Sequence, residues 1–141
     1  MGKAGTDSAH WQQWYDTMLI NRQWRMSLIA RLVKGLKDTP EGTGSMLDTS
    51  LVFNTSEFTC GTEHSARDLP ILLVGKAGNQ LKTGRYLTYN TKAASNPQTL
   101  DYASNVSTHN LFTTFLNLFG YPDTTFGNAD AAFQGPISGV T

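Results

Sequence analysis

The sequence is poor in cysteine and has no excess of either charge. Its single cysteine, Cys60, cannot form a disulfide within the chain. The 11 lysine and arginine residues balance 11 aspartate and glutamate residues, so the formal net charge is zero. A protein that holds nucleic acid through its phosphates needs an excess of basic side chains. We therefore expect no nucleic-acid partner.

Long apolar runs and glycine-rich nucleotide loops are also lacking. No window of about 18 apolar residues occurs, which predicts that no segment spans a membrane. Residues 1–11 lack the apolar centre that a signal peptide needs. The segment GKAGNQ (75–80) lacks the Lys-Ser/Thr ending of a P-loop and the glycine spacing of a dinucleotide site. We expect no nucleotide cofactor.

The 141 residues have the size of one ordinary domain, and the first pattern in them is a long helix. Apolar side chains recur at spacings of three and four over residues 8–37. The tryptophans Trp11, Trp14 and Trp24 lie on more than one side of this predicted helix. A helix that is apolar over so wide an arc needs more than one neighbour to cover it.

The middle of the chain predicts a linker and then strands. Residues 38–48 (DTPEGTGSMLD) are rich in turn formers and predict a linker. Within 49–89, the runs at 50–54 and 69–74 are apolar on successive residues, which is typical of buried strands. Residues 76–89 predict a turn followed by an exposed strand.

The last third of the chain predicts one helix and an irregular tail. The helix covers residues 107–119 and presents a stripe of leucine and phenylalanine side chains, with Gly120 and Pro122 after its end. Residues 120–141 predict the irregular tail. The order of helix, two buried strands and helix predicts an α/β fold.

The segment between the two predicted strands is crowded with ionisable side chains. It reads TSEFTCGTEHSARDLP (55–70). Glu57 and Glu63 offer oxygen ligands for a metal ion, and His64 offers a nitrogen ligand. In open α/β sheets, ligands bind beyond the carboxyl ends of the strands. A metal site is one interpretation. The other is that the carboxylates are solvated and His64 forms a hydrogen bond within the loop.

Three further side chains of this segment have chemical potential. Cys60 would be a nucleophile only if a base such as His64 converted it to a thiolate, and a cysteine enzyme is a rival hypothesis on that basis. Arg67 and Asp68 form an ion pair or a cap in the simplest interpretation.

Several motifs together resemble a known family. They are LINRQWRMSLIARLVKGLKDTPEGTGSMLDTSLVF, SEF, GTEHSARDLPILLVGKAGNQLKTGRYLTY and STHNLFTTFLNLFGYPDTTFG, in this order, and the resemblance runs from about Gly5 to the end of the sequence. The chain resembles the C-terminal region of a family of exported bacterial proteins, domain of unknown function fifteen-fifty-two. That family is itself similar to the alkaline phosphatase and sulfatase superfamily.

The resemblance implies a fold, a metal and an activity. The fold would be part of an alkaline-phosphatase-like three-layer sandwich. Glu57 and His64 would be metal ligands, with Arg67 and Asp68 in support, and the ion would be zinc, manganese, calcium or magnesium. The parent protein would be a metal-dependent hydrolase of phosphate or sulfate esters, exported to the periplasm or outside the cell.

The same resemblance implies that this chain is inactive alone. Relatives carry a longer N-terminal half that supplies the nucleophile and further metal ligands, and 141 residues do not include it. The expected partner is this missing half or another chain, bound through the long tryptophan-bearing helix. A different class of function also stays open, namely a non-catalytic surface or interaction protein that keeps the fold.

Overall fold

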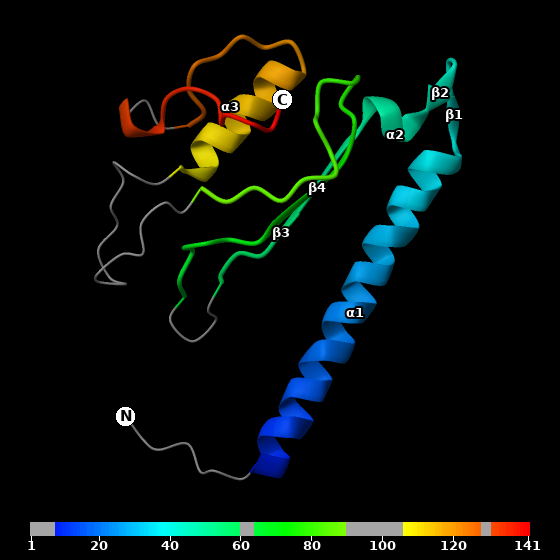
Figure 1. Ribbon diagram of the computed structural model, residues 1–141, viewed down its shortest axis with the longest axis vertical. Coiled ribbons are helices and arrows are strands. Elements are labelled where there is room, and N and C mark those ends of the chain that lie inside the picture. The colour runs from blue at the N-terminus through cyan, green and yellow to red at the C-terminus, as the bar shows by residue number, and fades with distance from the viewer. Residues whose placement is uncertain (1–7, 60–63, 90–105, 128–130) are drawn as a thin grey trace.

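The protein is a mixed helix and strand chain with two small antiparallel sheets. The computed structural model describes residues 8–59, 64–89, 106–127 and 131–141. In chain order the described elements are a long helix, a hairpin of two two-residue strands, a single helical turn, a strand pair, a second helix and a 3₁₀ turn. Figure 1 shows the strand pair and the second helix on one side and the long helix extending away from them.

Helix α1 (Ser8–Asp38) follows the predicted limits within one residue. Side chains one turn apart stabilise it, since Gln12 donates to Asp16 at 2.8 Å and Lys34 pairs with Asp38. The helix ends where the backbone N–H of Thr39 bonds back to Gly35, just before a proline. The predicted helix is therefore confirmed. The neighbours that would cover its wide apolar arc are absent along most of its length within the described residues.

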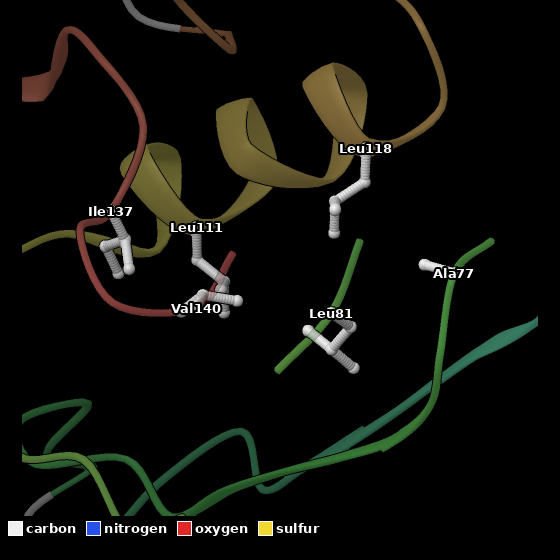
Figure 2. Close-up of a cluster of buried hydrophobic side chains, with 6 residues drawn as sticks. All are labelled: Ala77, Leu81, Leu111, Leu118, Ile137 and Val140. Carbon is white, nitrogen blue, oxygen red and sulfur yellow. The ribbon is translucent and has the colours of Figure 1, made fainter. Parts of the chain in front are cut away.

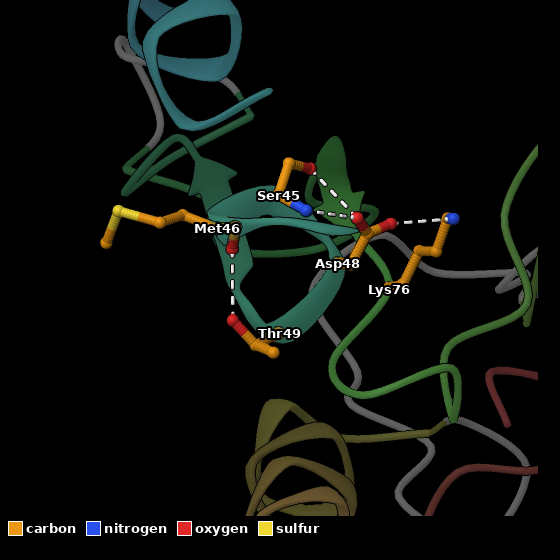
Figure 3. A network of polar contacts seen from close by, with 5 residues as sticks. All are labelled: Ser45, Met46, Asp48, Thr49 and Lys76. Atoms are coloured by element: carbon orange, nitrogen blue, oxygen red, sulfur yellow. Dashed lines mark hydrogen bonds and ion pairs between the residues drawn. The ribbon is translucent and has the colours of Figure 1, made fainter. Parts of the chain in front are cut away.

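The predicted linker contains short regular elements. Strands β1 (Pro40–Glu41) and β2 (Gly44–Ser45) form a tiny antiparallel hairpin, and α2 (Met46–Thr49) follows as one helical turn. Ser45 stands at the start of this turn, and the carboxylate of Asp48 accepts hydrogen bonds from its backbone N–H and its hydroxyl (Figure 3). These elements connect α1 to the larger sheet.

Strands β3 (Leu51–Thr55) and β4 (Ile71–Gly75) lie within one or two residues of the predicted runs and pair with each other. The pairing is antiparallel, from Leu51 opposite Gly75 to Thr55 opposite Ile71. The prediction of buried strands was wrong for most of their length. All of their residues except Gly75 are half-buried or exposed, because within the described residues no layer covers both faces of the pair.

The exposed strand predicted within residues 76–89 is absent from that segment. The chain turns immediately after β4 instead, where Ala77 and Asn79 adopt left-handed backbone angles (φ 44° and 67°) that a strand does not allow. This turn directs the following segment under the second helix.

Helix α3 (Thr108–Leu118) carries the core of the molecule. Ser107 caps it by accepting a hydrogen bond from the backbone N–H of His109. The core consists of apolar side chains from α3, the segment after β4 and the tail (Figure 2): Ala77, Leu81, Leu111, Leu118, Ile137 and Val140. The predicted stripe was partly wrong, because Phe119 is 55% exposed while Thr113 and Thr114 are buried.

The tail is irregular, as predicted, apart from the 3₁₀ turn η1 (Ala131–Phe133) within its described part. Polar side chains of α3 hold it in place. Asn110 donates to the carbonyls of Gln134 and Gly135 at 2.9 and 3.0 Å, and Thr114 accepts from the backbone N–H of Ile137 at 2.8 Å. Hydrogen bonds to side chains of α3 therefore hold this segment in place, although it has little regular secondary structure.

Candidate functional site

The crowded segment forms a long loop between β3 and β4, residues 56–70. Its two arms are joined close to the strands, because the backbone N–H of Thr59 donates to the carbonyl of Ser65 at 2.8 Å. The hydroxyl of Thr59 also bonds the carbonyl of Arg67, and that of Thr55 bonds Pro70 at 3.1 Å. The antiparallel pairing thus places the loop at a single edge of the sheet. Cys60 and Glu63 lie outside the described residues.

Glu57 and His64, the two predicted metal ligands, are both exposed on this loop. The ring of His64 lies against the ring of Phe58, with centroids 5.1 Å apart and planes tilted by 41°. The backbone of His64 is left-handed, with φ at 48°, so a tight turn fixes where its side chain starts. The His64 side chain thus contacts one aromatic ring and is otherwise exposed to solvent.

Arg67 and Asp68, the predicted supporting residues, follow on the second arm. Arg67 is half-buried, and its Nη1 atom has no hydrogen-bond partner within the described residues. Asp68 is exposed and has a left-handed backbone with φ at 51°. The loop therefore brings all four predicted residues to one edge of the sheet.

A metal ion needs more ligands than this loop shows. Protein zinc sites use three or four protein ligands, and calcium sites use more. Among the described residues, no three His, Cys, Asp or Glu side chains gather closely enough to hold an ion. Glu57 and His64 are therefore not a metal site by themselves.

A second chemically distinctive surface lies on α1. Every residue from 10 to 28 is exposed. The exposed fractions of Trp11, Trp14 and Tyr15 are 52%, 53% and 58%. Trp11 and Trp14 pack edge to face with centroids 5.9 Å apart. Only near the C-terminal end does α1 contact α2 and β2, where Val33 and Leu36 are half-buried.

A charged network fixes the base of α1 to the sheet. Lys76, just after β4, pairs with Asp48 of α2 at 2.7 Å (Figure 3). This hydrogen bond and those from Ser45 lower the pKa of Asp48 from 3.8 to about 2. Backbone bonds from Lys76, Ala77 and Gly78 to residues 47–50 continue the contact. The network is structural, because each of its charges is already paired.

Sequence reasoning missed this network and the buried polar face of α3. The Ser45-x-x-Asp48 spacing is a capping-box pattern that predicts a helix start at residue 46. No comparable signal existed for Asn110 or Thr114, because their partners are tail carbonyl and N–H groups more than 20 residues away.

Comparison of the chain with models of protein families, with curated proteins and with solved structures finds no match to any of them. Within its described part, no helix combines the length and the apolarity needed to cross a membrane.

Proposed function

We propose that the chain is a binding module that docks on another polypeptide through α1. The observation that carries this proposal is the unbroken exposure of α1 from residue 10 to residue 28, across a sequence rich in tryptophan and other large apolar residues. Leaving that surface in water is unfavourable, and large exposed apolar patches in folded proteins mark interaction sites.

The size of the patch supports a protein partner. A large aromatic side chain presents roughly 200 Å² when open, so Trp11, Trp14 and Tyr15 together expose about 300 Å² at half exposure. That already reaches the size of the largest patch on a typical monomer, about 300–600 Å². Met18 and Leu19 extend the same face by another turn.

The geometry matches recognition of an amphipathic helix by an apolar groove. Anchors in that mode recur at i, i+3, i+4 and i+7, which are the positions of Trp11, Trp14, Tyr15 and Met18. Aromatic anchors of this kind lose little conformational freedom on binding and often dominate the binding energy. The Trp11–Trp14 contact orders two of them in advance.

Photo-crosslinking tests the proposal. A benzoylphenylalanine at position 14 should give one predominant adduct in the native cell, and the same residue at position 13, on the side of the helix opposite Trp11, Tyr15 and Met18, should give little. The identified partner should then bind the purified chain with a negative heat-capacity change, and Trp11→Ala should weaken that binding. Equal adduct yields from positions 13 and 14, or an adduct of the chain with itself, would contradict the proposal.

A second candidate function concerns the loop of residues 56–70. The joined arms and the exposure of both Glu57 and His64 favour a contribution of two ligands to a metal centre completed by another polypeptide segment. From the resemblance of its motifs, we propose that the chain is part of an alkaline-phosphatase-like sandwich, from a metal-dependent hydrolase of phosphate or sulfate esters, and inactive alone.

Metal-dependent stability tests the second candidate. An ion that binds only the folded state raises the unfolding temperature. Zinc, manganese, calcium or magnesium should stabilise the wild-type chain more than Glu57→Ala or His64→Ala, whereas His10→Ala, an exposed histidine on α1, should behave like the wild type. Equal stabilisation of all four proteins would contradict it, as would hydrolysis of an aryl phosphate by the chain alone.

A further inference from the structure

Two arginines interrupt the apolar face of α1 at its centre. One row of positions, spaced alternately four and three residues apart, runs along this face. Its members are Trp11, Tyr15, Met18, Arg22, Arg25, Ile29, Leu32 and Leu36. We call this row the α1 seam. All of its members are apolar except the two arginines.

Arg22 and Arg25 are exposed, and within the described residues neither forms a salt bridge. The helix offers them no carboxylate, because its aspartates lie elsewhere. Asp38 pairs with Lys34 at the C-terminal end, and Asp16 accepts a hydrogen bond from Gln12. Any surface that covers the seam must therefore supply the counter-charge itself, because a buried charge without a partner is strongly unfavourable.

A second copy of the chain does not supply it. In a parallel pair of seams in register, Arg22 faces Arg22 and Arg25 faces Arg25. In an antiparallel pair whose seams overlap over their full length, Arg22 of one copy faces Arg25 of the other. Like charges placed together across an interface oppose association.

A lipid surface does not suit the seam either. Helices that lie in a membrane interface keep their basic residues on the polar face, where they meet the headgroups. Arg22 and Arg25 instead lie between Met18 and Ile29 on the apolar face. Insertion of this face would carry two charges toward the acyl chains.

We infer that α1 recognises a partner protein whose apolar groove carries carboxylates at its centre, opposite Arg22 and Arg25. The inference rests on the proposed binding function. The guanidinium group suits this role because its planar fork binds a carboxylate through two parallel hydrogen bonds. The apolar anchors supply affinity, and the arginines fix the register and reject grooves that lack acidic side chains.

The chain itself can be converted into a partner of this chemistry. The full-length R22E/R25E variant keeps the apolar seam and carries carboxylates at its centre. In sedimentation experiments, wild type mixed with this variant should form a heterodimer at least about tenfold tighter than either protein forms with itself. The control is Q13E/R31E, whose two changes lie five turns apart on the side of the helix opposite the α1 seam. Wild type mixed with this control should associate no more than wild type alone.

Each other outcome would overturn the inference. Self-association of the wild type as strong as the mixture would assign the face to a second copy. Binding of wild type to anionic phosphatidylglycerol vesicles, weakened by R22E/R25E and without heterodimer formation, would assign it to a lipid surface. A mixture that does not associate would show that an acidic centre is not what the seam selects. If face-specific crosslinking from position 14 persists in that case, only this inference fails; if it is also lost, the proposed binding function fails with it.

Discussion

Gly75 is the residue whose replacement by alanine tests the packing at the base of the molecule most directly. It ends β4 opposite Leu51 and adopts φ at 114°, which side chains rarely allow. A Cβ atom at this position would lie 2.2 Å from the carbonyl oxygen of Ser50 and 3.3 Å from that of Leu47. Both obstacles are backbone atoms, so they cannot rotate away as a side chain would.

The cost of Gly75→Ala follows from what the shift breaks. The carbonyl of Ser50 accepts from Ala77 N–H at 3.1 Å, and that of Leu47 accepts from Lys76 N–H at 3.2 Å. Each backbone hydrogen bond contributes about 1 kcal/mol, and the unfavourable backbone angle adds about 1–3 kcal/mol. We expect a loss of about 3–5 kcal/mol in the free energy of unfolding, a large part of a typical total of about 5–15 kcal/mol.

Denaturant unfolding followed by far-UV circular dichroism measures this loss, and amide hydrogen exchange locates it. The amides of Lys76 and Ala77 should lose protection first. Gly84→Ala is the matched control, because Gly84 also has a positive φ (74°) but has nothing within 4 Å of the added Cβ. It should cost only about 1–2 kcal/mol. Equal losses for the two variants would refute the steric argument.

Two further predictions concern polar groups. The pKa of Asp48 is lowered in the folded state, so its contact with Lys76 contributes stability that is fully present above about pH 4 and is lost as the pH falls toward 2. Unfolding midpoints of wild type and Asp48→Asn, measured over that range, should converge as the pH falls; a constant difference would contradict the assignment. Thr114→Val leaves the backbone N–H of Ile137 without a partner in a site where Thr114 is 1% exposed, which should cost about 1–3 kcal/mol and speed exchange of the Ile137 amide. Thr17→Val removes a hydroxyl that bonds a carbonyl four residues back on exposed α1, so it should change stability little, and a similar loss there would argue against burial as the cause.

Much of the local structure could be predicted from the order of the residues. The helix at 8–38, the strand positions and the Ser107 cap depend on side chains within a few residues of each other, and those spacings are visible in the chain. The same holds for the crowding of Glu57 and His64 in one segment. Whether Glu57 and His64 lie near a third metal ligand depends on segments that are distant in the sequence.

Other features were decided only by tertiary structure. The pairing of β3 with β4 is antiparallel because the chain reverses through residues 56–70, and two apolar runs alone do not distinguish this from a parallel arrangement. The buried face of α3 contains Thr114 because the tail offers this hydroxyl a hydrogen-bond partner, which no period in the helix reveals.

Helix α1 shows most clearly which features depend on sequence and which depend on tertiary structure. Its apolar face is determined by sequence, because the spacing of Trp11, Trp14 and Met18 follows the turn of any α-helix. Whether that face is core or surface was decided by where the rest of the chain lies. The described remainder packs around α3 and reaches α1 only at its C-terminal end, so it leaves the face in solvent. Periodicity specifies which side of a helix is apolar, and only long-range packing decides what covers it.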